Sequence, residues 1–253
     1  MGRLGIITYS YPHLKTEQLL LGLISPMSNN TKDLKVYALP FKKRKEREIL
    51  FLHRPNQANA VSPEVICKSY DIEYKECCSD LDIDDSCDEY LIAGAGILSA
   101  SAVEHKKIIN CHPGIIPIAR GLDAFKWSIY NMQPIGNTLH YINENVDDGE
   151  IIAVLPTPVF TTDSLETFAR RHYENEIKML SSFQYYINHP QNDYIGIEIQ
   201  EATMRMPFDV EVKMLDMFES YKERYTKKRN CKENDQNIYS GRDCPKTRSE
   251  SLT

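Results

Sequence analysis

Residues 109–152 read INCHPGIIPIARGLDAFKWSIYNMQPIGNTLHYINENVDDGEII, and this stretch carries most of the information on the fold. It begins as an apolar strand, which Pro113 ends, and passes into a loop rich in Pro and Gly. A helix is predicted over 123–132, with Asp123 as its cap, and two strands are predicted over 138–142 and 150–155. Strand and helix in alternation indicate an α/β domain.

The flanking sequence continues this alternation. Further strands are predicted at 5–9, 36–39, 72–74, 89–93 and 107–112, and further helices at 16–24, from Ser62 onward, from Thr162 or Asp163 to 187, and at 210–225. We therefore expect an α/β fold with a Rossmann-like, open, mostly parallel twisted sheet and helices on both faces.

Composition narrows the class of protein. The chain has 253 residues, a formal net charge of -6 and 42% hydrophobic residues, which is typical of a globular domain and argues against a nucleic-acid coat. We expect no membrane span, because no apolar run approaches about 18 residues. The start of the chain does not resemble a signal peptide. Seven cysteines without a spaced framework indicate reduced thiols and a cytoplasmic protein.

The two ends of the chain differ in charge. From Lys222 onward there are nine Lys and Arg and five Asp and Glu, which leaves a net charge of -10 on the remainder. We expect a principal domain at 1–207, a helix packed on it at 208–225, and a disordered polar tail at 226–253. The helix could bury its apolar side chains in the core or in a homodimer.

Asn110 and His112 form the first candidate site. Strand side chains alternate between faces, so this amide and this imidazole point to one side and Cys111 points to the other. Asn is a neutral donor suited to a carbonyl oxygen that gains charge, and His transfers protons near neutral pH. The alternative is an Asn that caps a turn and a His satisfied by the backbone. Because Cys111 and His112 diverge, we predict no metal site.

Two other segments could complete this site. The turn at 143–149, Asn-Glu-Asn-Val-Asp-Asp-Gly, is typical of a hairpin connection, and it could also bring a carboxylate to His112. The segment at 93–99, Ala-Gly-Ala-Gly-Ile-Leu-Ser, lacks a dinucleotide-binding pattern, but its small residues allow close approach of a flat ligand. Packing alone is the other explanation of these small residues.

The combination of motifs resembles the 10-formyltetrahydrofolate-dependent formyltransferase family. This family includes the glycinamide ribonucleotide and methionyl-tRNA formyltransferases and the sugar N-formyltransferases, and the short sugar enzymes are the most similar. The residues that carry the resemblance are Asn110, His112, Pro113, Arg120, Gly121, Gly136, Thr138, Val146, Asp147 and Gly149. The resemblance is good over residues 90–180 and looser over residues 1–85.

The resemblance implies transfer of a formyl group from 10-formyltetrahydrofolate to a primary amine, with no metal. Asn110 would donate to the developing oxyanion and His112 would assist it. Asp147 would hold His112, and Asp148 is the alternative partner. The folate would lie against Gly96, Ile97, Leu98, Asn143, Asn145 and Val146.

The amine that accepts the formyl group is indicated by a difference between this sequence and the family it resembles. Glycinamide ribonucleotide enzymes have a glycine-containing phosphate loop after the first strand, whereas residues 9–14 here, Tyr-Ser-Tyr-Pro-His-Leu, contain no glycine. The basic segment 42–54 could bind a pyrophosphate or could be a solvated loop. The substrate-binding residues predicted on this basis are Tyr11, His13, Arg44, Arg47, Arg54, Pro113, Tyr173 and Glu176. For Glu176, a helix-surface pair with Lys178 or Arg171 is the alternative.

We therefore predict a cytoplasmic enzyme that formylates the amino group of a nucleotide-linked amino sugar. Phosphoribosylglycinamide formyltransferase activity and a non-catalytic folate-binding role are the alternatives. The expected partners are small-molecule substrates and, as one option, a second copy of the chain, but neither nucleic acid nor a membrane.

Overall fold

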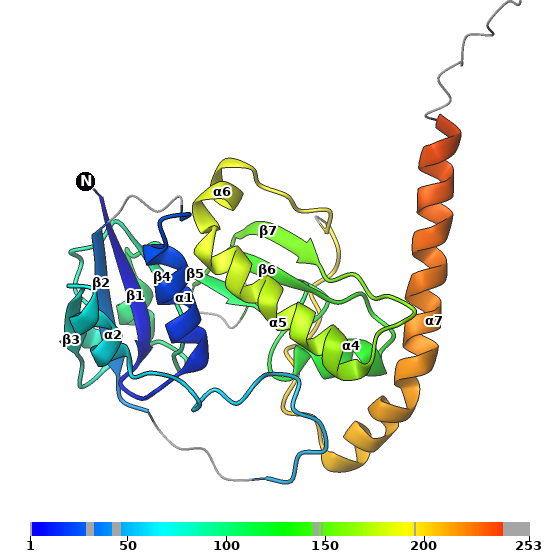
Figure 1. The fold of residues 1–253 in the computed structure, drawn as a ribbon, viewed down its shortest axis with the longest axis horizontal. Coiled ribbons are helices and arrows are strands. Elements are labelled where there is room, and N and C mark those ends of the chain that lie inside the picture. The colour runs from blue at the N-terminus through cyan, green and yellow to red at the C-terminus, as the bar shows by residue number, and fades with distance from the viewer. Residues whose placement is uncertain are drawn as a thin grey trace, which may run out of the picture.

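The computed structural model describes residues 2–28, 33–41, 47–143, 147, 149–194 and 196–239, with side chains up to Thr226. Seven strands form one sheet: β1 (Arg3–Tyr9), β2 (Asp33–Leu39), β3 (Glu73–Glu76), β4 (Glu89–Ile92), β5 (Ile108–His112), β6 (Gly136–Tyr141) and β7 (Ile151–Pro156). The helices are α1 (Leu14–Ile24), α2 (Pro63–Ser69), α3 (Ala100–Val103), α4 (Ala124–Tyr130), α5 (Leu165–Ser181), α6 (Phe183–Asn188) and α7 (Phe208–Tyr239), with a 3-10 turn at Asp80–Asp82. Figure 1 shows their arrangement.

The strand order is β3-β2-β1-β4-β5-β6-β7. All pairs from β3 to β5 are parallel, whereas β5–β6 and β6–β7 are antiparallel. The mostly parallel open sheet predicted from the sequence is therefore confirmed. The chain moves outward in opposite directions from β1 and from β4. In such sheets, ligands bind at the carboxyl ends of the two strands where the direction changes.

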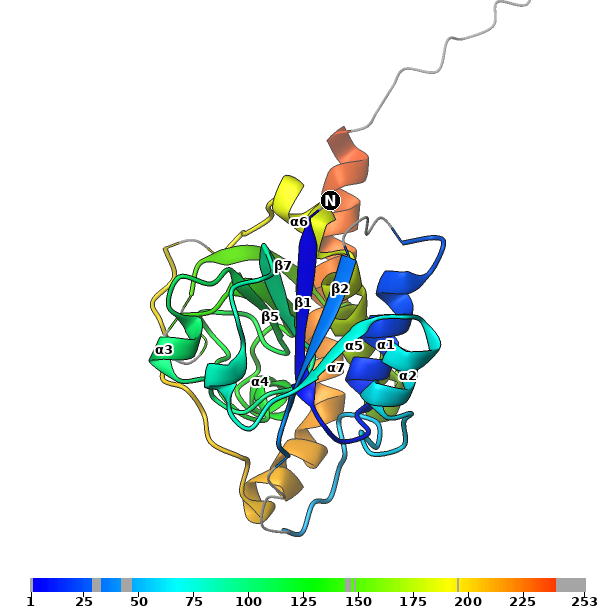
Figure 2. The ribbon, with the colours of Figure 1, turned by 90° about the vertical axis from the view of Figure 1, so that its left-hand side faces the viewer.

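Alternating strand residues build an apolar core on each face of the sheet. Leu4 and Ile6 of β1 pack with residues of α1, α2 and α5, while Ile7 packs in a second cluster that includes Ala102 of α3. Figure 2 shows α1, α2 and α5 on one side of the sheet and α3 on the other. The expected cover of helices on both faces is confirmed.

A third apolar cluster attaches α7 to the body. Met214, Phe218 and Tyr221 of this helix pack with Phe125 of α4 and Phe168 of α5. The predicted C-terminal helix is thus packed on the domain along its first half. Figure 1 shows its later turns extending beyond the other elements. Within the described part of the chain, no helix combines the length and hydrophobicity needed to cross a bilayer.

The long helix predicted to end near residue 187 ends at Asn188, but it differs from the prediction in its first residue and in its continuity. The helix expected up to residue 187 is divided into α5 and α6 at Ser182, and its N-cap is Ser164 rather than Thr162 or Asp163. The hydroxyl of Ser181 donates to the main-chain oxygens of Ile177 and Lys178, a contact that tends to bend helices.

The start of the predicted tail is also wrong. Residues 226–239 continue α7 instead of forming a disordered segment. A helix that is already nucleated and packed adds residues at little cost, and this segment contains Lys, Arg, Glu and Gln, which favour helix. Residues 240–253 lie outside the described residues.

Candidate active site

Strand β5 presents Asn110 and His112 on one face of the sheet at its carboxyl end. Cys111 points to the opposite face, where it is buried near Met179 of α5. The alternation predicted from the sequence is therefore confirmed. His112 is almost fully buried, whereas Asn110 remains partly exposed, so the amide is the group that a ligand can reach.

Both ring nitrogens of His112 face oxygen acceptors. Its Nδ1 lies 3.3 Å from Oδ2 of Asp147, and its Nε2 lies 2.8 Å from the main-chain oxygen of Ala119. Each ring nitrogen therefore has an oxygen that can accept a hydrogen bond from it, and the carboxylate fixes the orientation of the ring. A Cβ at Gly114 would lie 2.7 Å from Nε2 and 2.3 Å from the Ala119 oxygen, so the turn can close around the ring only with glycine.

Asp147 is held by the loop that follows β5. Its main-chain oxygen accepts from Nε of Arg120 at 2.8 Å, and its Oδ2 accepts from the N–H of Gly121 at 3.0 Å. This carboxylate is the one that faces His112. Asp148, the alternative partner, lies outside the described residues.

His140 is a site residue that the sequence analysis missed. It pairs with Asn110 across the antiparallel strands β5 and β6, and its Nε2 lies 3.4 Å from Nδ2 of the Asn110 amide. Its Nδ1 lies 3.0 Å from the main-chain oxygen of Tyr141. The signal that could have found it is the antiparallel register, which places residues 110 and 140 side by side on one face.

His140 is neutral and has a defined tautomer. Burial, together with the nearby His112, lowers its pKa to about 4, although Asp147 acts in the opposite direction. Nδ1–H donates to Tyr141, so Nε2 is left to accept from the Asn110 amide. The amide is thereby oriented with its nitrogen toward His140, and its second N–H is free to donate to a ligand.

The segment 93–99, with its small residues, lies beside the carboxyl end of β1, where the N–H groups of Ala93 and Gly94 contact the main-chain oxygen of Ile7. A Cβ at Gly94 would lie 2.9 Å from the ring of His13 and 3.0 Å from that of Tyr9, so this turn is packed directly against the β1–α1 turn. Gly96 faces open space, and the side chain of Ile97 is 84% exposed. Leu98 is buried in the same apolar cluster as Ile142, which joins this segment to the turn after β6.

The remaining predicted folate contacts are only partly described. Asn143 is exposed at the end of β6. Asn145 and Val146 lie outside the described residues. Among the described residues, no group of three or more His, Cys, Asp or Glu side chains is placed to hold a metal ion.

Exposed aromatic side chains lie at the carboxyl ends of β1 and β2. Tyr11 and Phe41 are stacked at 5.1 Å between ring centroids and are 43% and 45% exposed. Tyr9 contacts Phe41 edge-on and also contacts the ring of His13. His13, whose Nδ1 lies 2.9 Å from the hydroxyl of Thr16, is the N-cap residue of α1. Two predicted substrate residues, Tyr11 and His13, therefore lie close together beyond the carboxyl end of β1.

Glu176 is not a surface carboxylate, as the alternative assumed, because it is only 1% exposed. Its carboxylate lies 2.7 Å from Nζ of Lys15 and 2.6 Å from a guanidinium nitrogen of Arg54, not beside Lys178 or Arg171. Burial alone would raise the pKa of Glu176, but the two cations outweigh it and lower the pKa to about 2. Glu176 is committed to these cations and is not free for an amine.

Other predicted substrate residues are also engaged within the protein. Arg47 donates to Oδ2 of Asp123 at 2.8 Å and to the main-chain oxygen of Met206 at 2.6 Å. Asp123 is the N-cap residue of α4, as predicted, but its carboxylate holds this arginine and makes no cap hydrogen bond. The Tyr173 hydroxyl donates to Gln18 at 2.8 Å, and the main-chain oxygen of Pro113 lies 3.3 Å from Nε2 of His172.

Of the three arginines predicted to bind a pyrophosphate, the two that the structure describes are engaged by carboxylates. Arg54 is bound to Glu176 and Arg47 to Asp123, and Arg44 lies outside the described residues. The sequence showed the basic composition of this segment but not its acidic partners, which are more than 70 residues away in the chain.

The N-terminus of α1 is occupied by Gln57. Its main-chain oxygen accepts from the N–H of Leu14 at 2.8 Å, and its side-chain Oε1 accepts from the N–H of Lys15 at 3.1 Å. A helix N-terminus next to a strand end is a common place for a phosphate, because its N–H groups point outward. Here two of those N–H groups already have acceptors within the protein.

The class defined by these features is an open α/β protein that carries a partly exposed Asn and a buried His–Asp pair at the carboxyl edge of its sheet. Residues 91–183 match the family model for formyl transferase, and this segment contains β5, α4, β6, β7 and α5. The resemblance to the formyltransferase family predicted from the sequence is therefore confirmed over this segment.

Curated relatives match about a third of the chain or less. Phosphoribosylglycinamide formyltransferase of Haemophilus influenzae is 35% identical over 74 residues, which cover 29% of this chain and 35% of the relative. The Bacillus subtilis enzyme of the same name is 36% identical over 77 residues, which cover 30% of this chain and 40% of the relative. The alignments thus span less than half the length of these relatives.

Solved structures show the same fold over most of the chain. Phosphoribosylglycinamide formyltransferase from Anaplasma phagocytophilum is 23% identical, with a TM-score of 0.51 and coverage of 80% of this chain and 95% of that one. A sugar N-formyltransferase from Shewanella is 18% identical, with a TM-score of 0.51 and coverage of 86% and 88%. A 4-N formyltransferase from Francisella tularensis is 18% identical, with a TM-score of 0.53 and coverage of 85% and 86%.

Proposed function

We propose that this protein transfers a formyl group from 10-formyltetrahydrofolate to a primary amine. The observation that carries the proposal is the placement of a reachable Asn110 amide beside a buried His112, with Asp147 at 3.3 Å from the His ring. An amide donor and a carboxylate-supported imidazolium are suited to a carbonyl oxygen that gains negative charge.

The residues around the segment 93–98 fit a flat heterocyclic formyl donor. Gly96 leaves open space, Ile97 exposes an apolar surface, and the 93–98 segment packs with Ile142 in one cluster. Small residues let the backbone approach such a ring, and exposed main-chain groups can hydrogen-bond to its edge. Gly96, Ile97, Leu98 and Asn143, with Asn145 and Val146, would hold 10-formyltetrahydrofolate, which supplies the formyl group when bound.

Asn110, His112 and Asp147 have different roles in the transfer. Asn110 donates its free N–H to the formyl oxygen as the acceptor amine attacks the formyl carbon. His112 supplies positive charge to the same region, and Asp147 keeps its ring in place. The bond between the formyl carbon and the folate nitrogen would then break, and that nitrogen would take up a proton. The attacking amine would lose a proton to the Asp147 carboxylate or to water beside it. Removal of one such donor typically costs about 3–4 kcal/mol of transition-state stabilisation.

For the acceptor, we propose the amino group of a nucleotide-linked sugar. The closed N-terminus of α1 at Gln57 disfavours a terminal phosphate at that place, and residues 9–14 lack glycine. The exposed Tyr11–Phe41 stack offers an aromatic face to a base or sugar, with His13 nearby. The other predicted substrate residues that the structure describes would hold the neighbouring segments in place; they are Tyr173, Pro113 and Arg54.

Phosphoribosylglycinamide is the alternative acceptor. It is favoured by the curated relatives named phosphoribosylglycinamide formyltransferase. The β1–α1 turn and Gln57, on which the sugar acceptor depends, lie outside the segment 91–183 that matches the family model. The cytoplasmic location, the homodimer and the exclusion of nucleic acid and membranes as partners stay predictions.

A panel of acceptors tests both steps of the proposal. The purified protein is incubated with 10-formyltetrahydrofolate and dTDP-, UDP- and GDP-linked amino sugars, beside glycinamide ribonucleotide, and formylated product is measured. We expect turnover of a sugar nucleotide. Turnover of glycinamide ribonucleotide alone would refute the sugar acceptor, and folate binding without transfer to any amine would favour a non-catalytic role.

Variants then connect the activity to the site. Asn110→Ala is expected to lower kcat by about 100- to 1000-fold, and His112→Ala is expected to do at least the same. Asn59→Ala, an exposed asparagine on a loop, is the matched control and should keep full activity. Activity close to wild type in both site variants would contradict the assignment.

A further inference from the structure

The position of Asp147 depends on the loop segment 120–121. Arg120 donates to the main-chain oxygen of Asp147, and the N–H of Gly121 donates to its carboxylate at 3.0 Å. Asp147 has a φ of 48°, in the left-handed region that a residue with a side chain adopts only at a cost. A residue keeps such a backbone conformation only when contacts with its neighbours stabilise it. The hydrogen bonds from residues 120 and 121 are among the contacts that stabilise Asp147.

This loop segment is itself held by residues 200–206, which we call the C-terminal strap. The N–H of Thr203 donates to the main-chain oxygen of Arg120 at 3.0 Å, and the N–H of Leu122 donates to the oxygen of Thr203 at 2.8 Å. The Thr203 hydroxyl lies 2.9 Å from the oxygens of both Arg120 and Leu122. Thr203 is therefore hydrogen-bonded to the residues on both sides of Gly121. The N–H of Gly121 in turn donates to Asp147.

The contact between strap and loop is close. Gly121 has a φ of 85°, and a Cβ there would lie 2.3 Å from the main-chain oxygen of Thr203 and 2.6 Å from its nitrogen. No side chain can be placed between the two backbones. A displacement of Thr203 must therefore move Gly121 and, with it, the donor that holds Asp147.

The strap has other attachments that do not involve the Thr203 side chain. The oxygen of Gln200 accepts from Arg120 at 3.1 Å, and the oxygen of Met204 accepts from Nε1 of Trp127 at 2.8 Å. The N–H of Met206 donates to Asp123 at 3.1 Å. Loss of the Thr203 hydroxyl should therefore loosen the loop locally without releasing the whole strap.

We propose that Thr203 is a positioning residue for the formyl transfer reaction. Its hydroxyl and main chain fix residues 120–122, these residues fix Asp147, and Asp147 keeps its ion-pair distance of 3.3 Å to His112. The inference rests on the proposed function, in which Asp147 supports the imidazolium. It assigns a role to the C-terminal strap, which lies outside the matched segment 91–183.

The kinetic test compares two substitutions of the same residue. Thr203→Val keeps the shape but removes the hydroxyl, and it should lower kcat about tenfold, as is typical when a support of a functional side chain is lost, with KM values nearly unchanged. Thr203→Ser restores the hydroxyl and should return kcat to near the wild-type value. A Thr203→Val enzyme with wild-type kcat, or a Thr203→Ser enzyme as slow as Thr203→Val, would overturn the proposal.

Two controls separate positioning from loss of stability. Met204→Ala changes an exposed side chain in the same strap and should keep full activity. Thr167→Val removes a hydroxyl from the capping box of α5, so it lowers stability at a distance from Asp147 and should leave kcat unchanged. If Thr167→Val slows transfer as much as Thr203→Val does, the effect is one of stability and the proposal is wrong.

A measurement without substrate keeps the two proposals distinct. Amide hydrogen exchange of Gly121 reports the bond to Asp147, and in Thr203→Val we expect exchange at Gly121 to accelerate about tenfold while that of Ile6 in the central strand stays unchanged. Unchanged exchange at Gly121 would contradict the positioning role. Absence of formyl transfer by the wild-type protein would instead refute the proposed function and leave this comparison intact.

Discussion

Nε2 of His140 lies 3.4 Å from the amide nitrogen of Asn110, and the two residues are directly paired across β5 and β6. Because His140 donates through Nδ1 to Tyr141 and is neutral, it can only accept from Asn110. It therefore determines which end of the Asn110 amide faces the ligand.

We predict that His140→Ala lowers kcat by about 10- to 100-fold, the usual loss when a residue that orients a functional side chain is removed. His140→Gln can place an amide oxygen near Asn110 and should retain more activity than His140→Ala. The measurement is steady-state formyl transfer with saturating donor. Equal activity of the wild type and both variants would mean that Asn110 is oriented without His140.

Glu176 is predicted to be essential for stability rather than for amine binding. Glu176→Gln removes the charge between Lys15 and Arg54, and breaking a buried ion pair from one side typically costs about 3–5 kcal/mol. Urea unfolding measures the loss. Glu174→Gln, on the exposed face of the same helix, should change stability little. A Glu176→Gln protein as stable as the control, with a raised acceptor KM, would restore the substrate-binding role.

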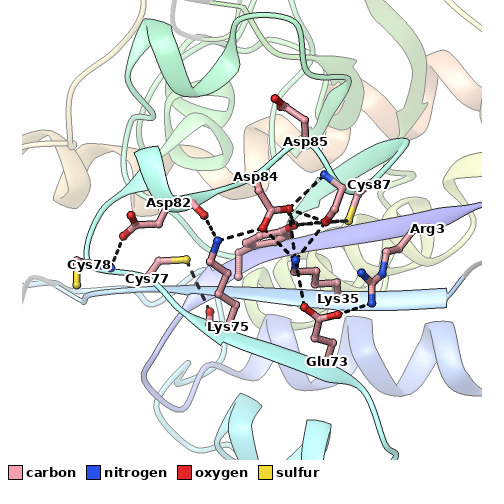
Figure 3. A network of polar contacts seen from close by, with 12 residues as sticks. Arg3, Lys35, Glu73, Lys75, Cys77, Cys78, Asp82, Asp84, Asp85 and Cys87 are labelled. Carbon is pink, nitrogen blue, oxygen red and sulfur yellow. Dashed lines mark hydrogen bonds and ion pairs between the residues drawn. The ribbon is translucent and has the colours of Figure 1, made fainter.

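Asp84 is the centre of a polar network that holds the loop before β4 onto β2 and β3 (Figure 3). Its carboxylate accepts from Tyr37 and Ser86 and lies 3.0 Å from the ammonium groups of both Lys35 and Lys75. Although partial burial opposes the effect, these hydrogen bonds hold its pKa below the ordinary value. The network thus fastens one edge of the sheet.

Asp84→Asn should therefore lower the free energy of unfolding by about 1–3 kcal/mol, the range for hydrogen bonds to a charged group. The matched control is Asp85→Asn, whose carboxylate is 82% exposed and pairs with Lys106. Such an exposed pair typically contributes less than about 1 kcal/mol. Equal unfolding midpoints for the two variants would show that the network around Asp84 adds nothing to stability.

Stability is predicted to fall in mild acid because of buried neutral histidines. Burial lowers the pKa of His172 to about 4, and that of His140 also to about 4, from the ordinary histidine value of 6.5. Between pH 6.5 and 4 the unfolded chain therefore binds protons that the folded chain does not. The free energy of unfolding decreases as the pH falls through this window, by up to about 1.4 kcal/mol per histidine for each pH unit.

Unfolding by urea at about pH 7, 6, 5 and 4, which spans this window, measures the dependence. His172→Asn is expected to be less stable than the wild type at neutral pH but to lose less stability on acidification, since it removes one of the titrating groups. His105→Asn, at an exposed position, should leave the slope unchanged. A His172→Asn slope equal to that of the wild type would contradict the assignment.

The sequence by itself determined the features that depend on local pattern. Alternation along a strand places Asn110 and His112 on one face and Cys111 on the other, whichever fold surrounds them. Pro113 ends β5, and the run of strands and helices predicts a parallel sheet whose carboxyl edge carries the site. The order of motifs around Asn110 and Asp147 was sufficient to indicate the formyl transferase family.

Only the tertiary structure decided the contacts between distant charges and polar groups. Glu176 is paired with Lys15 and Arg54, and Arg47 with Asp123, although the partners are far apart in the chain. No local pattern encodes such pairs, because they depend on how helices and loops pack on the sheet. The antiparallel register that brings His140 to Asn110, and the strap that brings Thr203 to Gly121, are likewise results of chain topology.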